Sequence, residues 1–142
     1  MNIGILGYGK VAKELTNLLH STDHKLFSWR NSPEAPRDQY FKKIWGDETP
    51  HPITQRNMIG LVVDTLGNRQ DSTAMSKDSI EKSLKNNKVV ITCNKELIEK
   101  ESEYVNGLLN EQKDKFFAIS VNGDEKDVAL AILNKINELS IK

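Results

Sequence analysis

Short apolar runs alternate with longer amphipathic stretches along this chain. Continuous apolar runs are typical of strands that are covered on both faces, whereas apolar residues repeating every three or four positions indicate helices. Strands are predicted at 2–7, 24–29, 59–66, 88–93 and 115–121. Helices are predicted at 10–21, 71–86, 95–112 and 125–139, with 124 as an alternative start for the last. The stretch 31–58 has a weaker pattern. It has a proline-containing break at 31–36, a helical turn or two indicated by Tyr40, Phe41, Ile44 and Trp45, and a second break at 46–52.

This alternation of strands and helices predicts the fold class. Strands separated by helices are joined by crossover connections, which give a parallel sheet with helices on both faces. The chain is therefore expected to form one α/β domain over residues 1–142, with no second domain and a doubly wound, mainly parallel sheet of Rossmann type. Ligands bind such sheets at the carboxyl ends of strands, which directs attention to 7–10, 30–32, 64–67 and 92–95.

A glycine-rich turn, GYGKVA, joins the first predicted strand to the first helix. The order strand, Gly-x-Gly-x-x-Ala, helix is the fingerprint of dinucleotide-binding turns. The first glycine permits the tight turn, the second lets the backbone approach a pyrophosphate, and the helix start attracts phosphate. The alternative is a structural turn that binds nothing. The predicted cofactor-binding residues of this turn are Gly7, Tyr8, Gly9, Lys10 and Val11.

The residues after the second strand bear on which dinucleotide is bound. An NAD site usually has an acidic residue there, about 20 residues after the glycine turn, to accept from the ribose hydroxyl. Here the position holds Arg30, followed by Asn31 and Ser32. A guanidinium can pair with a 2′-phosphate, and the other two side chains can add hydrogen bonds. The sequence thus favours NADP(H) over NAD(H), the alternative being a solvated arginine.

Composition excludes several classes of partner. Basic and acidic residues balance at 20 each, so the net charge predicts neither a nucleic-acid partner nor an anionic membrane surface. No apolar run reaches the length of about 18 residues that a membrane span needs. The single cysteine, Cys93, fits a reducing cytoplasm and is expected to be a small buried side chain. His20 and His24 lack further ligands nearby, so no metal site is predicted.

Three strand ends carry a resemblance to a known family. They read Val62-Val63-Asp64, Val90-Ile91-Thr92-Cys93-Asn94-Lys95 and Ile119-Ser120-Val121-Asn122-Gly123. In order and spacing, over nearly the whole chain, they resemble the homoserine dehydrogenases. That resemblance implies a nicotinamide-dependent interconversion of L-homoserine and L-aspartate 4-semialdehyde.

The same resemblance implies roles for particular residues. Lys95 matches the family's lysine near the nicotinamide and substrate hydroxyl, where it could transfer a proton. Its alternative reading is a surface lysine at a helix start. Asp64 could act as a base, although a turn or capping role is the more expected one. The predicted cofactor-binding residues of these strand ends are Asp64, Thr65, Leu66, Thr92 and Asn94.

The chain also departs from the family. Family members continue into a substrate-binding, dimerising domain, whereas here Gly123-Asp124-Glu125 leads into a single helix, and Ala118 replaces a family glutamate. We therefore expect cofactor binding with little or no turnover. Two alternatives stay open, namely a dinucleotide-binding regulatory or sensor module and another small NAD(P)-dependent dehydrogenase or reductase.

The last helix carries more apolar residues than one buried stripe needs. The surplus residues are Leu130, Leu133 and Ile141. Exposed apolar residues on a helix favour contact with another chain. The sequence therefore predicts a homodimer contact through the C-terminal helix.

Overall fold

The computed structural model describes residues 1–7, 9–29, 47–48, 53–55, 57–67 and 72–140, and the statements below concern these residues. The strands are β1 (Asn2–Leu6), β2 (Lys25–Trp29), β3 (Asp47–Glu48), β4 (Leu61–Asp64), β5 (Val89–Thr92) and β6 (Phe116–Ala118). The helices are α1 (Lys10–Leu19), the 3-10 helix η1 (Ile53–Gln55), α3 (Ser72–Lys85), α4 (Lys95–Lys100), α5 (Ser102–Glu111) and α6 (Glu125–Ser140).

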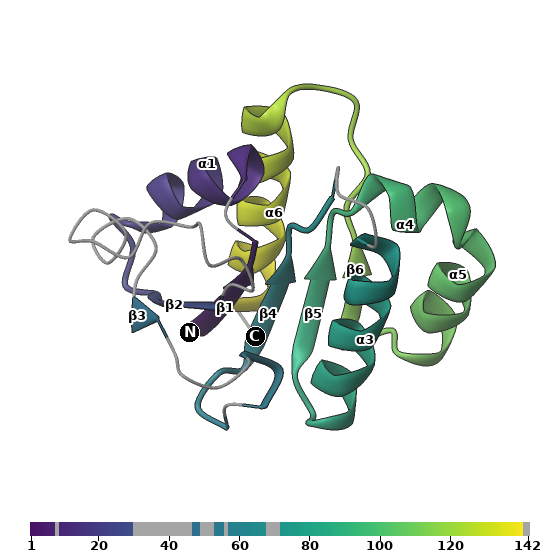
Figure 1. The fold of residues 1–142 in the computed structure, drawn as a ribbon. Helices are drawn as coiled ribbons and strands as arrows, with labels where there is room; N and C mark the ends of the chain where they lie inside the picture. The colour runs from purple at the N-terminus through teal and green to yellow at the C-terminus, as the bar shows by residue number, and fades with distance from the viewer. Residues whose placement is uncertain (8, 30–46, 49–52, 56, 68–71, 141–142) are drawn as a thin grey trace.

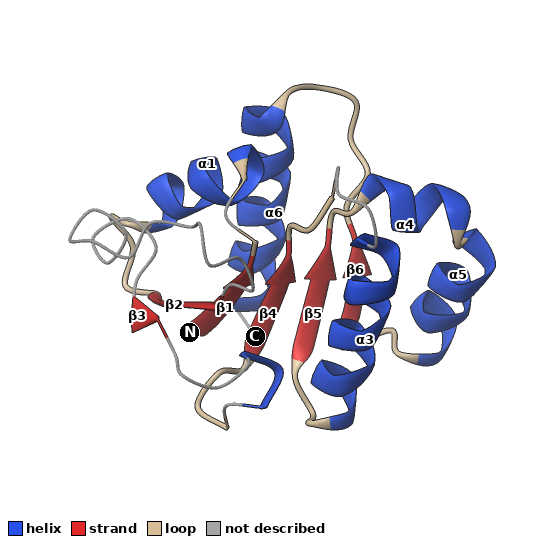
Figure 2. Cartoon of the chain, in the orientation of Figure 1, coloured by secondary structure: helices blue, strands red, loops and turns tan. Residues whose placement is uncertain are grey.

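The six strands form one parallel sheet in the order β3-β2-β1-β4-β5-β6 (Figure 2). From β1 the chain adds strands on one side, and it then returns to place β4 on the other side. The strand order therefore reverses between β1 and β4, where Leu6 lies opposite Asp64. This order is that of the doubly wound dinucleotide-binding fold, and it confirms the predicted α/β Rossmann-type fold class.

Helices cover both faces of the sheet (Figure 1). Because successive side chains of a strand point to opposite faces, β1 sends Ile3 and Ile5 to one face and Leu6 to the other. On the first face α1 and α6 pack together over a core that includes Leu15 and Ile132. On the second face α3, α4 and α5 cover β5 and β6, and η1 covers β1 and β2. The side chains buried on this face form two clusters. The cluster beneath α3, α4 and α5 contains Ile80, Val90, Leu97, Val105 and Phe116, and the cluster around η1 contains Leu6, Phe27, Ile53, Ile59 and Val62.

The single helix predicted at 95–112 is wrong, because the structure has two helices there. The break is at Glu101 (φ −119°, ψ 43°), which ends α4 and begins α5. At 100° per residue, Leu97 and Val105 would lie about 80° apart around a straight helix. That separation fits within one apolar stripe, and both side chains enter the same core cluster on either side of the break. Amphipathic periodicity alone did not reveal it.

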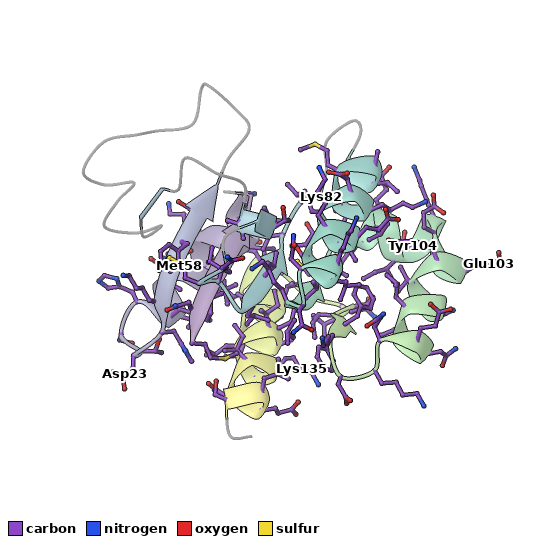
Figure 3. The ribbon with its side chains drawn as sticks, turned by 90° about the horizontal axis from the view of Figure 1, so that it is seen from below. Asp23, Met58, Lys82, Glu103, Tyr104 and Lys135 are labelled. Carbon is purple, nitrogen blue, oxygen red and sulfur yellow. The ribbon has the colours of Figure 1, made fainter. Side chains whose placement is uncertain are left out.

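Contacts between α3 and α5 hold this break in place. The Lys77 ammonium lies 3.6 Å from the Glu101 carboxylate and 4.7 Å from the centre of the Tyr104 ring. The Tyr104 hydroxyl donates to Glu81 at 3.3 Å, and Figure 3 shows Tyr104 between the two helices. On the other face of the sheet, Lys135 of α6 lies 4.8 Å from the ring centre of Phe117.

The buried side of α3 also differs from the prediction. The apolar pattern of 71–86 predicts that Met75, Ile80 and Leu84 point inward. Ile80 is fully buried and Leu84 packs partly buried against the same cluster, whereas Met75 is half-buried. The buried face is otherwise made of serines, namely Ser72, Ser76 and Ser83. A hydrophobic pattern cannot indicate a helix face that packs through hydroxyl groups.

Two further predictions need adjustment. The short strand β3 and the helix η1 lie in a stretch for which no such elements were predicted.

The surplus apolar residues of α6 were expected to be exposed. Leu133 instead packs against the core, and Leu130 is the exposed large apolar residue among the described residues of α6, at 50 %. Ile141 lies outside the described residues.

No helix in the described part of the chain combines the length and apolar character needed to cross a membrane.

Candidate functional site

A cavity of about 450 Å³ opens at the carboxyl edge of the sheet, beside the point where the strand order reverses. This edge is uppermost in Figure 1, where the segments following β4 and β5 and the start of α6 come together. Four segments contribute to its wall. Among the described residues these are Gly9, Lys10 and Val11; Thr65, Leu66 and Gly67; Cys93, Asn94, Lys95 and Glu96; and Gly123, Asp124, Glu125 and Val128.

Gly7 shapes the turn that leads to this cavity. Its φ of +100° lies in a region that L side chains rarely adopt, and an added Cβ would lie 2.7 Å from the Thr65 hydroxyl. That hydroxyl donates to the Leu6 carbonyl at 2.6 Å. The end of β1 and the end of β4 are thereby joined directly, and glycine is required where they meet.

The N-terminus of α1 is open toward the cavity. Gly9 caps the helix in an extended conformation (φ −75°, ψ −162°), with no side-chain hydrogen bond to the first turn and no acidic residue within it. A Cβ added at Gly9 would meet nothing within 4 Å. Lys10, an exposed cation, follows immediately. Uncapped N–H groups, the positive end of the helix dipole and a lysine together suit an anionic ligand such as a phosphate.

The second helix start at the cavity, that of α6, is closed. The Asp124 carboxylate accepts from the backbone N–H groups of Lys126 at 3.0 Å and Asp127 at 3.1 Å. The Asp127 carboxylate accepts in return from the Asp124 N–H at 3.1 Å. Since this helix start already has carboxylates bound to it, an anion in the cavity is favoured at α1.

The turn between β5 and α4 brings Lys95 to the cavity wall. Asn94 caps α4 through its side-chain oxygen, which accepts from the Leu97 N–H at 3.3 Å. Lys95 is the exposed first residue of the helix. A hydrogen bond from Lys100 lowers the pKa of the Glu96 carboxyl, so that group is ionised at neutral pH.

Cys93 is buried in the same wall. Burial and the nearby Asp64 charge raise the pKa of its thiol to about 12. The thiol therefore stays protonated near neutral pH and is a poor nucleophile, which fits the expected packing role. Lys95 is the cationic side chain that this turn brings to the cavity wall.

Asp64 and Thr92 lie beneath the cavity and are not among the described residues of its wall. Both are buried, and the Thr92 hydroxyl donates to the Asp64 carboxylate at 2.8 Å. The same carboxylate accepts from the Leu66 N–H at 2.9 Å, which is the turn role that the sequence suggested. Burial raises the pKa of Asp64, and hydrogen bonds oppose this rise in part.

The predicted cofactor-binding residues thus divide into three groups. Those at the cavity wall are Gly9, Lys10, Val11, Thr65, Leu66 and Asn94, with the candidate catalytic residue Lys95. Those behind it are Gly7, Asp64 and Thr92. Tyr8, Arg30, Asn31 and Ser32 lie outside the described residues.

Sequence reasoning missed part of the wall. Glu96, Gly123, Asp124, Glu125 and Val128 were not predicted as site residues, although four of them follow the carboxyl end of β6 or begin α6. The rule that directs attention to the carboxyl ends of strands, applied to β6, would have found those four.

No protein-family model matches the chain, and no curated protein matches it in sequence. Solved structures match its fold. S. aureus homoserine dehydrogenase has a TM-score of 0.62 at 19 % identity, over 83 % of this chain and 32 % of its own. Biliverdin reductase from Synechocystis sp. PCC 6803, in complex with biliverdin and NADP+, has a TM-score of 0.62 at 16 % identity, over 82 % and 37 %.

Scyllo-inositol dehydrogenase from Lactobacillus casei, with bound NAD(H) and scyllo-inositol, has a TM-score of 0.58 at 19 % identity, over 83 % of this chain and 35 % of its own. The chain therefore spans about a third of the length of these structures. At such low identity the likeness establishes a Rossmann-type fold of the kind found in oxidoreductases.

Proposed function

We propose that residues 1–142 form the nicotinamide-dinucleotide-binding part of an oxidoreductase. The observation that carries this proposal is the uncapped N-terminus of α1 at the strand-order reversal, with open space where a Gly9 side chain would be. A pyrophosphate needs close approach to backbone N–H groups, and this helix start offers it. Neighbours of the same fold with bound NADP+ or NAD(H) support the same class of ligand.

The cavity wall suggests how the ligand would be held. The pyrophosphate would lie at Gly9, Lys10 and Val11, and the segment from Thr65 to Gly67 would flank the sugar and ring. The nicotinamide, when bound, supplies the hydride acceptor or donor. Lys95 would then hold or move a proton at the substrate oxygen through its Nζ atom. Its exposed position at the start of α4 is compatible with that role.

Finer features of the proposal rest on the sequence. Arg30, with Asn31 and Ser32, supports a preference for NADP(H) over NAD(H). The strand-end motifs support a homoserine dehydrogenase type of reaction. Because the chain spans about a third of the neighbouring structures, we expect these residues alone to bind cofactor with little or no oxidation of homoserine.

Calorimetric titration with NADPH and NADH tests this function, and Gly9→Ala is the decisive variant. Its Cβ would occupy the space needed by the pyrophosphate, while its φ suits alanine and no atom clashes. We expect NADPH to bind more tightly than NADH, and Gly9→Ala to weaken NADPH binding at least about tenfold, since one or more charged hydrogen bonds are lost.

Gly60→Ala is the matched control, because its added Cβ also meets nothing within 4 Å and Gly60 is not part of the described cavity wall. It should bind NADPH as the wild type does. Failure of the wild type to bind either dinucleotide would overturn the proposal, as would unchanged binding by Gly9→Ala. Homoserine-dependent reduction of NADP+, measured on the same samples, then separates a binding module from a complete catalyst.

A further inference from the structure

A ring of buried polar groups lies directly beneath the cavity wall. Its members come from three elements: Asp64 ends β4, Thr92 and Asn94 lie at the end of β5, and Ser76 lies on the buried face of α3. Their side chains are at most 1 % exposed. Buried polar groups are costly unless they are satisfied, so a network at this depth restricts how its elements can move.

The hydrogen bonds of this ring have a single consistent direction. The Thr92 hydroxyl donates to the Asp64 carboxylate at 2.8 Å, and the neighbouring Ser76 hydroxyl acts to lower the pKa of that carboxyl. The same two hydroxyls both accept from Asn94, Thr92 from its backbone N–H at 3.3 Å and Ser76 from its side-chain amide at 2.9 Å. Asn94 donates to both hydroxyls, and the Thr92 hydroxyl donates in turn to the carboxylate, so these bonds run in one direction from Asn94 to Asp64.

The ring connects the two turns that form the middle of the cavity wall. Asp64 reaches the first turn by accepting from the Leu66 N–H at 2.9 Å. It reaches the second through Thr92, and its own backbone carbonyl accepts from the Cys93 N–H at 3.0 Å. Asn94, which completes the ring, also caps the helix that begins with Lys95. A displacement of either turn would therefore break bonds in the other.

We infer that Asp64 is a positioning residue, which acts from beneath the cavity to hold the turn at Thr65–Gly67 and the turn at Cys93–Glu96 in one arrangement for a bound dinucleotide. This inference rests on the proposed function for its ligand, but its geometric part concerns the chain alone. Asp64 acts through Leu66 and Asn94, which are part of the cavity wall, and through Thr92, which lies beneath it. The ring thereby fixes Lys95 relative to the Leu66 side of the cavity.

Three variants test this role through NADPH affinity. Asp64→Asn replaces one acceptor oxygen with a donor, so either the Leu66 N–H or the Thr92 hydroxyl loses its acceptor, and we expect about a tenfold loss of affinity. Thr92→Val removes one hydroxyl at nearly constant volume and should have a similar effect. Thr92→Ser restores the hydroxyl and should recover most of the affinity, which a role in packing alone would not predict.

Ser83→Ala is the matched control. Like Ser76, Ser83 is a fully buried serine of α3, but its hydroxyl has no hydrogen-bond partner among the described residues. This variant should bind NADPH as the wild type does. Urea unfolding of every variant identifies those that are merely unstable, and Thr92→Val keeps the inference testable if Asp64→Asn does not fold.

A second measurement needs no ligand. Cys93 is the single cysteine of the chain and lies in the second turn, so its rate of reaction with a maleimide reports on opening of that turn. We expect Asp64→Asn and Thr92→Val to react several-fold faster than the wild type, and Ser83→Ala to react at the wild-type rate. The Thr92→Val rate is the decisive one, because loss of the Asp64 charge would by itself lower the pKa of the thiol. If the wild type binds no dinucleotide but these rates rise, the proposed function fails and the positioning role stands. Unchanged affinity together with unchanged rates would overturn the role of Asp64.

Discussion

Asp64 has an unusual environment for a carboxylate, since it is fully buried and accepts hydrogen bonds from the Thr92 hydroxyl and the Leu66 N–H. Burial disfavours its charged form, and its pKa in the folded chain is raised. An acid with a raised pKa contributes stability that is complete below its unfolded pKa and is lost as pH rises through the folded value. Ionisation of Asp64 therefore reduces the stability of the fold.

The free energy of unfolding should reflect this dependence on pH. Asp64→Asn has no titrating group at this position, so wild-type stability relative to the variant should rise as pH is lowered from 7 toward the ordinary aspartate value near 4. Urea unfolding of both proteins at several pH values measures the difference. A difference that stays constant across this range would show that Asp64 does not titrate there.

Single residues also show how far the sequence could predict the site. Gly7 and Gly9 could be assigned their parts in the turn because backbone conformation and space depend on having no side chain. The burial of Asp64 and Thr92 could not be predicted in the same way. A polar residue at a strand end can face a ligand or a neighbouring turn, and the partner Ser76 lies in a helix whose position is set by the whole fold.

Among the elements, α5 contains a glycine, which lowers the stability of a helix. Gly107 lies inside Ser102–Glu111, and an added Cβ would meet nothing within 4 Å. Alanine loses less backbone entropy than glycine in a helix. We expect Gly107→Ala to raise the free energy of unfolding by about 0.5–1 kcal/mol. Urea unfolding would measure the change, and a loss of stability would mean that the space beside Gly107 is not open.

Strands and long helices were the elements best predicted from sequence. The apolar runs of β1, β4 and β5 are continuous because both faces of these strands are covered. The break at Glu101 escaped prediction because both halves of the segment are amphipathic, and the contacts that hold the break come from Lys77 and Glu81 of α3. The buried serines Ser72 and Ser76 of α3 escaped prediction for a related reason, since their partners, Glu96 and Asn94, lie in other elements.

For the whole molecule, the homodimer through α6 remains a prediction. The structure reduces the number of exposed apolar residues on α6 that could form the contact. Leu133 packs against the core, which leaves Leu130 as the exposed large apolar residue of the described part of α6. If α6 forms the contact, the wild type should have the mass of two chains in analytical ultracentrifugation, and Leu130→Glu should have the mass of one. A wild-type mass of one chain would remove the homodimer.

The order of the strands has a further consequence, which concerns how the chain folds. β1 pairs with β2 on one side, but its other partner, β4, begins only at Leu61. Parallel pairing between distant segments makes folding slow for a chain of this size. The cavity takes its wall from residues between Gly9 and Val128, so it exists only when nearly all of the domain has assembled. A ligand bound there would stabilise the finished domain by slowing its unfolding and would leave the early steps of folding unaided.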